Sequence, residues 1–230
     1  MRKFLSLLLL IAAGCAAPPR EEAPRAPAAP APTGIEEPAT PAETWTVVGS
    51  QLAVRVYRDG PMQKLGHNHL VTSDAMSGEI RLRKPLADSR FELRLPLESL
   101  VVDDPAARAA AGAAFSAPVP EKDREATRQN MLGEKLLDAA RQGEMRLAAE
   151  SISGTPGHYE ARLRVSLGGE EHTIAAPFTV RVEGDRLTAR ADFHLKHADL
   201  GLEPFALALG ALKVRDDFEV DLTLEARRGS

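Results

Sequence analysis

The sequence predicts a mainly β fold, an antiparallel barrel of about eight strands with one helical excursion at about residues 121–142. Two segments carry this prediction, because every second residue in 187–195 and 218–226 is apolar and the residues between them are polar. Successive side chains of a strand point to opposite faces, so each segment would have one buried and one wet face. Further short alternating segments between turn residues, without a helix-bundle period or a repeat, favour the same class.

The other strands are expected from the same alternation, and turn residues separate them. Turns are predicted at Arg58 to Pro61, at Gly168-Gly169 and at Glu183 to Asp185. In chain order the expected strands cover residues 45–56 (one long bent strand or a pair), 65–71, 76–82, 91–97, 145–152, 159–167, 172–182, 187–195 and 218–226.

Residues 99–144 interrupt this pattern. Asp103-Asp104-Pro105 is typical of a loop or a helix cap, and the alanine-rich stretch 105–112 predicts one or two helical turns. The stretch 121–144 predicts a helix with a break near Gly133. We expect this helix to cover one end of the sheet.

Closure into a barrel is favoured over a sandwich, because closure removes the exposed edges of long strands. An eight-stranded barrel is about the size at which the interior either fills with side chains or holds one small ligand. Small inward candidates such as Ala161, Ala189 and Ala191 leave room, whereas facing Leu and Phe side chains could fill it. Both interiors stay open at this point.

Composition limits the class of protein. The length of 230 residues is typical of one domain with additional segments. The chain is 43% hydrophobic but only 4% aromatic, which predicts a largely aliphatic core. The formal net charge of −4 comes from mixed charges without clustered Lys and Arg, so we expect no nucleic-acid partner. The single cysteine excludes an intrachain disulfide.

The N-terminus predicts a bacterial lipoprotein. Residues 1–14 form a signal peptide, with a basic start, an apolar run too short to span a bilayer and small residues before Cys15. This arrangement resembles a lipobox, which implies cleavage before Cys15 and its acylation. Residues 15–43 then form a lipidated, Pro/Ala-rich disordered tether to a domain at 44–228. The chain would be anchored in the cell envelope, facing the periplasm, and Ala16 favours the outer over the inner membrane.

Several landmarks along residues 45–227 together resemble the YceI-like family of secreted, lipocalin-like barrels. Their order and spacing carry the resemblance: Trp45, Ser77-Gly78-Glu79-Ile80, Asn130-Met131-Leu132, Leu136-Leu137-Asp138, Leu163-Arg164-Val165, Ala198-Asp199-Leu200-Gly201-Leu202 and Gly210-Ala211-Leu212-Lys213-Val214-Arg215-Asp216. The resemblance implies an extended antiparallel barrel whose apolar interior binds an isoprenoid, an isoprenoid quinone or another lipid. The lipoprotein tether, the motif Leu65-Gly66-His67-Asn68-His69 and the long segment 103–120 depart from the commoner pattern.

His67 and His69 are the sharpest polar feature. In a strand, residues two apart share a face, so both rings could hydrogen-bond a ligand headgroup or coordinate a metal ion. A zinc site needs three or four ligands, and the candidates for a third are a carboxylate or one of His158, His172, His194 and His197. We favour hydrogen bonding over a metal, because an isolated H-x-H pattern is weak. No nucleophile elbow, phosphate loop or dinucleotide fingerprint is present, so we expect no enzyme and no cofactor beyond a bound lipid.

The predicted function is therefore the binding of an apolar, chain-like ligand by an envelope-anchored barrel. Two alternatives stay open: a metal-binding protein or metal-dependent enzyme centred on His67 and His69, and a filled barrel with a structural or interaction role. The residues expected to line a binding interior are Phe178, Val180, Phe193, Leu195, Phe218, Val220 and Leu222.

Overall fold

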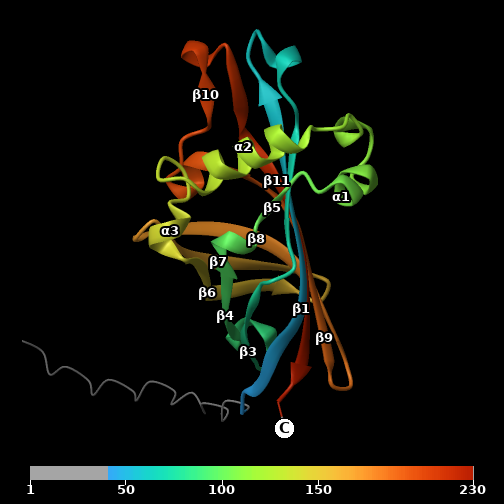
Figure 1. Cartoon of the computed structure of the whole chain (residues 1–230). Coiled ribbons are helices and arrows are strands. Elements are labelled where there is room, and N and C mark those ends of the chain that lie inside the picture. The colour runs from blue at the N-terminus through green and yellow to red at the C-terminus, as the bar shows by residue number, and fades with distance from the viewer. Residues whose placement is uncertain (1–40, 230) are drawn as a thin grey trace, which may run out of the picture. The chain divides into compact units, whose positions relative to one another are not determined.

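A closed antiparallel β-barrel forms the centre of the protein, whose computed structural model describes residues 41–229 (Figure 1). Cys15, the predicted signal peptide and most of the tether lie outside the described residues. In chain order the strands are β1 (Glu43–Asp59), β2 (His69–Ser73), β3 (Ser77–Leu82), β4 (Arg90–Pro96), β5 (Val101–Val102), β6 (Glu144–Thr155), β7 (His158–Leu167), β8 (Glu170–Glu183), β9 (Arg186–Lys196), β10 (Ala206–Leu207) and β11 (Leu212–Arg228).

Eight strands close the barrel in the order β1-β3-β4-β6-β7-β8-β9-β11, because β11 also pairs with β1. The expected barrel is therefore confirmed, and the sandwich is not formed. The strand predicted from residue 45 is one strand of 17 residues with register shifts after Val47 and Val56. One edge of β1 pairs with β11 along its length, while the other edge pairs first with β3 and then with β2.

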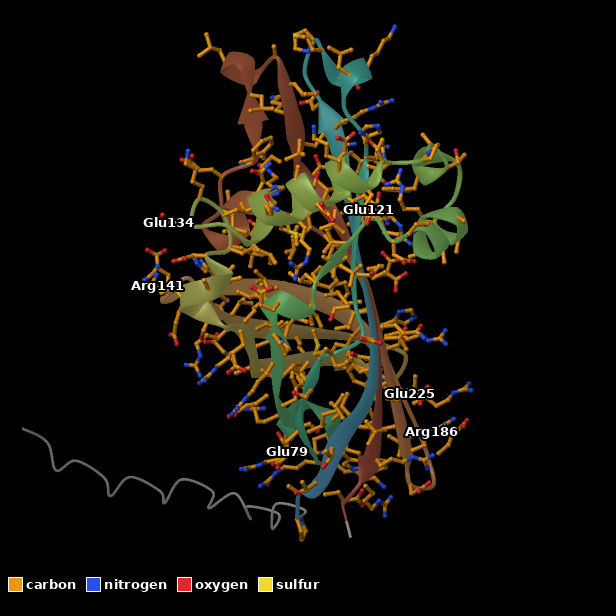
Figure 2. The ribbon with its side chains drawn as sticks, in the orientation of Figure 1. Glu79, Glu121, Glu134, Arg141, Arg186 and Glu225 are labelled. Carbon is orange, nitrogen blue, oxygen red and sulfur yellow. The ribbon has the colours of Figure 1, made fainter. Side chains whose placement is uncertain are left out.

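The alternation of β9 and β11 has the predicted consequence. The two strands pair in register, with Leu195 opposite Phe218, Phe193 opposite Val220 and Ala191 opposite Leu222. Polar residues of the same strands lie on the outer surface, where Arg186 and Glu225 form an ion pair at 3.6 Å (Figure 2). The inward faces of the barrel strands join in one apolar cluster that includes the fully buried Trp45.

The helices interrupt the barrel between β5 and β6. The α-helices there are α1 (Pro105–Ala110), α2 (Glu121–Leu132) and α3 (Ala139–Gln142). Short 3-10 helices occur along the whole domain, and they are η1 (Gln63–Leu65), η2 (Leu86–Asp88), η3 (Leu97–Ser99), η4 (Ala113–Phe115), η5 (His197–Leu200) and η6 (Ala208–Gly210). α2 ends at Gly133, where the break was expected. No helix among residues 41–229 has both the length and the hydropathy needed to cross a bilayer.

The strand expected over residues 65–71 begins only at His69, and this part of the prediction is wrong. η1 precedes it, and Gly66, His67 and Asn68 form a connection. The side chain of Asn68 accepts a backbone hydrogen bond that a carbonyl oxygen of a paired strand would otherwise accept. Its Oδ1 accepts the Arg58 N–H at 3.1 Å. A side-chain acceptor there ends the regular ladder on this side of β1.

Candidate functional site: an apolar cavity with one polar end

The barrel encloses a cavity of about 370 Å³. Its wall has 44 residues, of which 38 are apolar, and five of the seven phenylalanines of the chain belong to it. This volume lies within the range of small-molecule sites, which are mostly apolar with few polar groups. An interior packed with side chains was the alternative, and the cavity is at odds with it.

All seven residues expected to line a binding interior lie in the cavity wall. Two come from β8, two from β9 and three from β11, and they are Phe178, Val180, Phe193, Leu195, Phe218, Val220 and Leu222. Helix α2 adds Thr127, Asn130 and Met131 to the wall. α2 is held in place by Arg128, whose guanidinium donates to the carbonyl oxygens of Leu100 and Glu98.

The two histidines of the cavity wall lie at the same level of the barrel, whereas Ser89 lies beside Arg83 just before β4 and Arg190 lies in the middle of β9. His69 lies opposite Val56 on β1, Val56 lies opposite Phe218 on β11, and Phe218 lies opposite Leu195 on β9. His69, Val56, Phe218 and Leu195 therefore form one row across four strands, and His197 follows Leu195 by two residues. His197 packs edge-on against the Phe218 ring, with ring centroids 5.0 Å apart. Both histidines line the cavity.

His69 is held by a buried carboxylate that sequence reasoning missed. The His69 Nδ1 lies 2.6 Å from Oδ2 of Asp103, whose side chain is fully buried. The other oxygen of Asp103 accepts the Leu70 N–H at 2.8 Å and the Arg108 Nη1–H at 2.5 Å. Arg108 is also buried, and it donates to the carbonyl oxygens of Asn68 and Ala117.

These contacts decide the charge of Asp103. Burial by itself raises the pKa of the Asp103 carboxyl, but the hydrogen bonds from His69, Leu70 and Arg108 outweigh it and hold the pKa below its usual value. The carboxylate is therefore ionised at neutral pH and can only accept, so the His69 Nδ1 carries the shared proton. When the ring is neutral, its acceptor is therefore Nε2, on the edge that faces away from Asp103.

His197 is oriented in the same manner by a backbone group. Its Nδ1 donates to the carbonyl oxygen of Asp216 at 2.7 Å, and its ring is buried. A neutral His197 therefore also has its acceptor at Nε2. Two oriented imidazoles at one end of a hydrocarbon-lined cavity can hydrogen-bond a polar headgroup while the remainder of a ligand lies among apolar side chains.

The two histidines singled out by the sequence do lie close together, although His67 precedes the strand. Their ring centroids are 6.4 Å apart and their planes are inclined by 65°. Among residues 41–229, no group of three or more His, Cys, Asp or Glu side chains is arranged to hold a metal ion. The carboxylate that lies beside His69 is Asp103, and its hydrogen bond occupies the Nδ1 of the ring.

Asp103 and Asp104 have different roles, and the sequence pattern had assigned one role to both. Asp104 caps α1, because its Oδ1 accepts the N–H groups of Ala106 and Ala107 at 3.0 and 2.9 Å. Asp103 is neither a cap nor a loop residue exposed to water. Its side chain is fully buried and its backbone has a positive φ of 55°, a region that Asp tolerates better than most residues do.

Comparison with known proteins places this architecture. BcnA of Burkholderia cenocepacia is similar in structure with a TM-score of 0.55 at 12% identity, over 76% of this chain and 95% of its own. The YceI protein of Campylobacter jejuni is similar with a TM-score of 0.50 at 9% identity, over 70% and 85% of the two chains. At such identities the likeness shows the fold alone. No curated protein matches.

The sequence itself matches the pattern of the YceI-like domain over residues 45–226. This match spans most of the chain and all eight strands of the closed barrel. The protein therefore belongs to the YceI-like domain family.

Proposed function

We propose that the protein is an envelope-anchored lipoprotein that binds an apolar, chain-like ligand, namely an isoprenoid, an isoprenoid quinone or another lipid, inside its barrel. The single observation that supports this most is the cavity of about 370 Å³ with 38 apolar residues in its wall. Burial of one methylene contributes about 0.8 kcal/mol, so a chain of a few five-carbon units supplies enough free energy for stable binding.

The polar end gives the ligand a direction. His69, oriented by Asp103, would hydrogen-bond a headgroup through Nε2, and His197, which also lines the cavity, would add a second polar contact. The tail would then extend along the barrel past the aromatic rings of Phe193 and Phe178. A hydrogen bond of this kind contributes about 1 kcal/mol, so it orients the ligand more than it retains it.

The anchor follows from the predicted lipobox. Two or more acyl chains on Cys15 give stable membrane attachment, and the tether gives the domain freedom of position. Intact mass spectrometry of the membrane-extracted protein tests this, because cleavage before Cys15 and triacylation give one defined mass that a Cys15→Ser variant cannot reach. Separation of inner and outer membranes by density then tests the expected outer-membrane location.

Native mass spectrometry tests the ligand. The sample is the chain from residue 15 onward with Cys15→Ser, exported to the periplasm behind the signal peptide of a soluble protein. A co-purifying mass of lipid or quinone size, released by organic solvent, supports the proposal. A protein that carries only a divalent metal, or nothing even after incubation with lipid extract, contradicts it.

A matched pair of variants separates the cavity from the outer surface. Ala176 and Ala175 are neighbours on β8, but Ala176 is buried in the cavity wall and Ala175 is exposed on the outside. Ala176→Phe fills space that the ligand needs and should abolish the co-purifying mass, whereas Ala175→Phe should keep it. Ala191→Phe, from the partly buried part of the wall, repeats the test where Ala176→Phe disturbs folding.

A further inference from the structure

Exposed apolar side chains are concentrated at one end of the protein. Residues 41–229 include eight exposed large apolar side chains, and five of them belong to two connections: Met62 and Leu65 after β1, and Phe205, Leu207 and Leu209 before β11. We call these five residues the apolar tip. Figure 1 shows both connections at the end that carries β10, beyond α2 and away from β3.

The two connections form one surface, although about 140 residues separate them in sequence. The Met62 N–H donates to the carbonyl oxygen of Ala211 at 2.8 Å. On the strands below, Lys213 pairs with Asp59 of β1 on one side and with Ala206 of β10 on the other. The apolar tip is therefore a continuation of the sheet rather than two independent loops.

Leu209 is the most exposed residue of the tip. Its exposure is 109%, and its backbone lies in the left-handed region at φ 56° and ψ 36°. A residue with a β-carbon pays about 1–2 kcal/mol for that conformation, and water solvation of a leucine gives nothing in return. A strained leucine held in solvent indicates a surface that is covered when the protein works.

The tip is also the outer rim of the cavity. Phe205 is 40% exposed and at the same time lines the cavity, as does Val214 on the neighbouring strand. The connection that bears Met62 and Leu65 leads directly into His69 at the polar end. A ligand leaving the polar end would therefore meet the apolar tip before it met water.

We propose that the apolar tip inserts into the lipid bilayer, so that the polar end of the cavity opens toward the headgroup layer. The occupant is a phospholipid surface rather than a protein, because the tip combines large apolar side chains with Lys64, which is exposed between Met62 and Leu65. A lysine beside apolar residues places its ammonium among lipid phosphates while its stem stays in the apolar region.

The chain before the barrel is long enough for this orientation. β1 begins at Glu43, at the opposite end from the tip, and its 17 residues rise by about 3.3 Å each, or roughly 55 Å. The segment from residue 16 to residue 42 can span up to about 90 Å. A Cys15 anchor therefore permits the tip to face the same bilayer, and anchoring makes weak insertion sufficient by raising the local concentration.

Vesicle flotation tests the proposal on the unanchored chain from residue 15 with Cys15→Ser. The vesicles contain phosphatidylethanolamine and phosphatidylglycerol at millimolar lipid. The double variant Leu65→Glu/Leu209→Glu should lose binding by about tenfold or more, since charged groups are expelled from the apolar layer. The matched control Val48→Glu/Val182→Glu changes two exposed valines away from the tip and should bind as the parent does.

Three results would overturn the proposal: no flotation of the parent chain, an equal loss in the control, or a concentration-dependent dimer in sedimentation that only the tip variant abolishes. The last result would assign the tip to a second copy of this chain. All substituted residues are exposed, and circular dichroism of each variant verifies the fold. The assay requires no bound ligand, so docking can fail or hold independently of the ligand proposal.

Discussion

Asp103→Asn tests the physical role of the buried network most directly. The substitution removes one negative charge and changes almost nothing else, since Asn has the shape of Asp and also tolerates the left-handed backbone that Asp103 adopts at φ 55°. Arg108 stays charged in its buried position, where it keeps neutral oxygen acceptors such as the carbonyls of Asn68 and Ala117 but loses the negative charge of Asp103.

The expected loss of stability follows from the burial. Removal of one partner from a buried ion pair costs about 3–5 kcal/mol, because the remaining charge has no counter-ion. The amide oxygen of Asn in the place of Oδ1 can still accept the hydrogen bonds from Leu70 and Arg108, and only the one from His69 is lost, so we expect the lower limit, about 3 kcal/mol. For a domain of this size, that loss lowers Tm by roughly 6–12 °C.

Asp104→Asn is the matched control, one residue further along the chain. Asp104 caps α1 through its side-chain oxygen, and Asn caps a helix about as well as Asp does. We therefore expect a change within about 0.5 kcal/mol. Urea unfolding at neutral pH, followed by the fluorescence of the single and fully buried Trp45, measures both variants.

The stability that Asp103 contributes should depend on pH in a definite direction. The pKa of Asp103 is lower in the folded protein than its usual value, so ionised Asp103 contributes stability above the unfolded pKa of about 3.9. That contribution is lost as the pH falls through the folded pKa, and the gap between parent and Asp103→Asn should close in that range. Equal stability of Asp103→Asn and Asp104→Asn at neutral pH would refute the reasoning.

Three further predictions follow from other parts of the barrel. Gly78→Ala should lower the free energy of unfolding in urea by more than about 2 kcal/mol, because the added β-carbon would lie 2.1 Å from the Glu92 carbonyl oxygen. In the control Gly168→Ala, the added β-carbon has no atom within 4 Å, so the cost should be about 1 kcal/mol for the positive φ alone. Arg186→Ala should cost less than about 1 kcal/mol, and this cost should shrink as salt is added, since its ion pair is half exposed and therefore screened. His69→Phe should weaken a ligand with a polar headgroup about tenfold more than a bare hydrocarbon chain, as measured by displacement of a fluorescent fatty acid; equal weakening would argue against a headgroup contact.

The faces of the strands were predictable because they depend on a local property. Alternation within 187–195 and 218–226 states which side chains share a face, and the structure places the apolar set of both segments inward. The cap by Asp104 and the end of α2 at Gly133 are also local, since each depends on backbone groups within a few residues.

Other features depend on which segments meet, and no local pattern records that. The strand expected over residues 65–71 was shortened by Asn68, whose side chain replaces a ladder partner for Arg58. Likewise, Asp103 and His69 are 34 residues apart, so the run Asp103-Asp104-Pro105 contains no sign of the imidazole that one of its carboxylates orients.

The sequence by itself determined the class of fold, the inward faces of its strands and the family resemblance, because side-chain period and turn residues act over a few positions. The tertiary structure decided that β11 returns to β1 and closes the barrel, that the interior keeps a cavity rather than filling, and that the histidines stand at one end of it. It also brought together the two parts of the apolar tip, which follow the first strand and precede the last strand in the sequence. The physical reason is that register and closure are set by the summed packing of the whole sheet, which no short stretch of sequence contains.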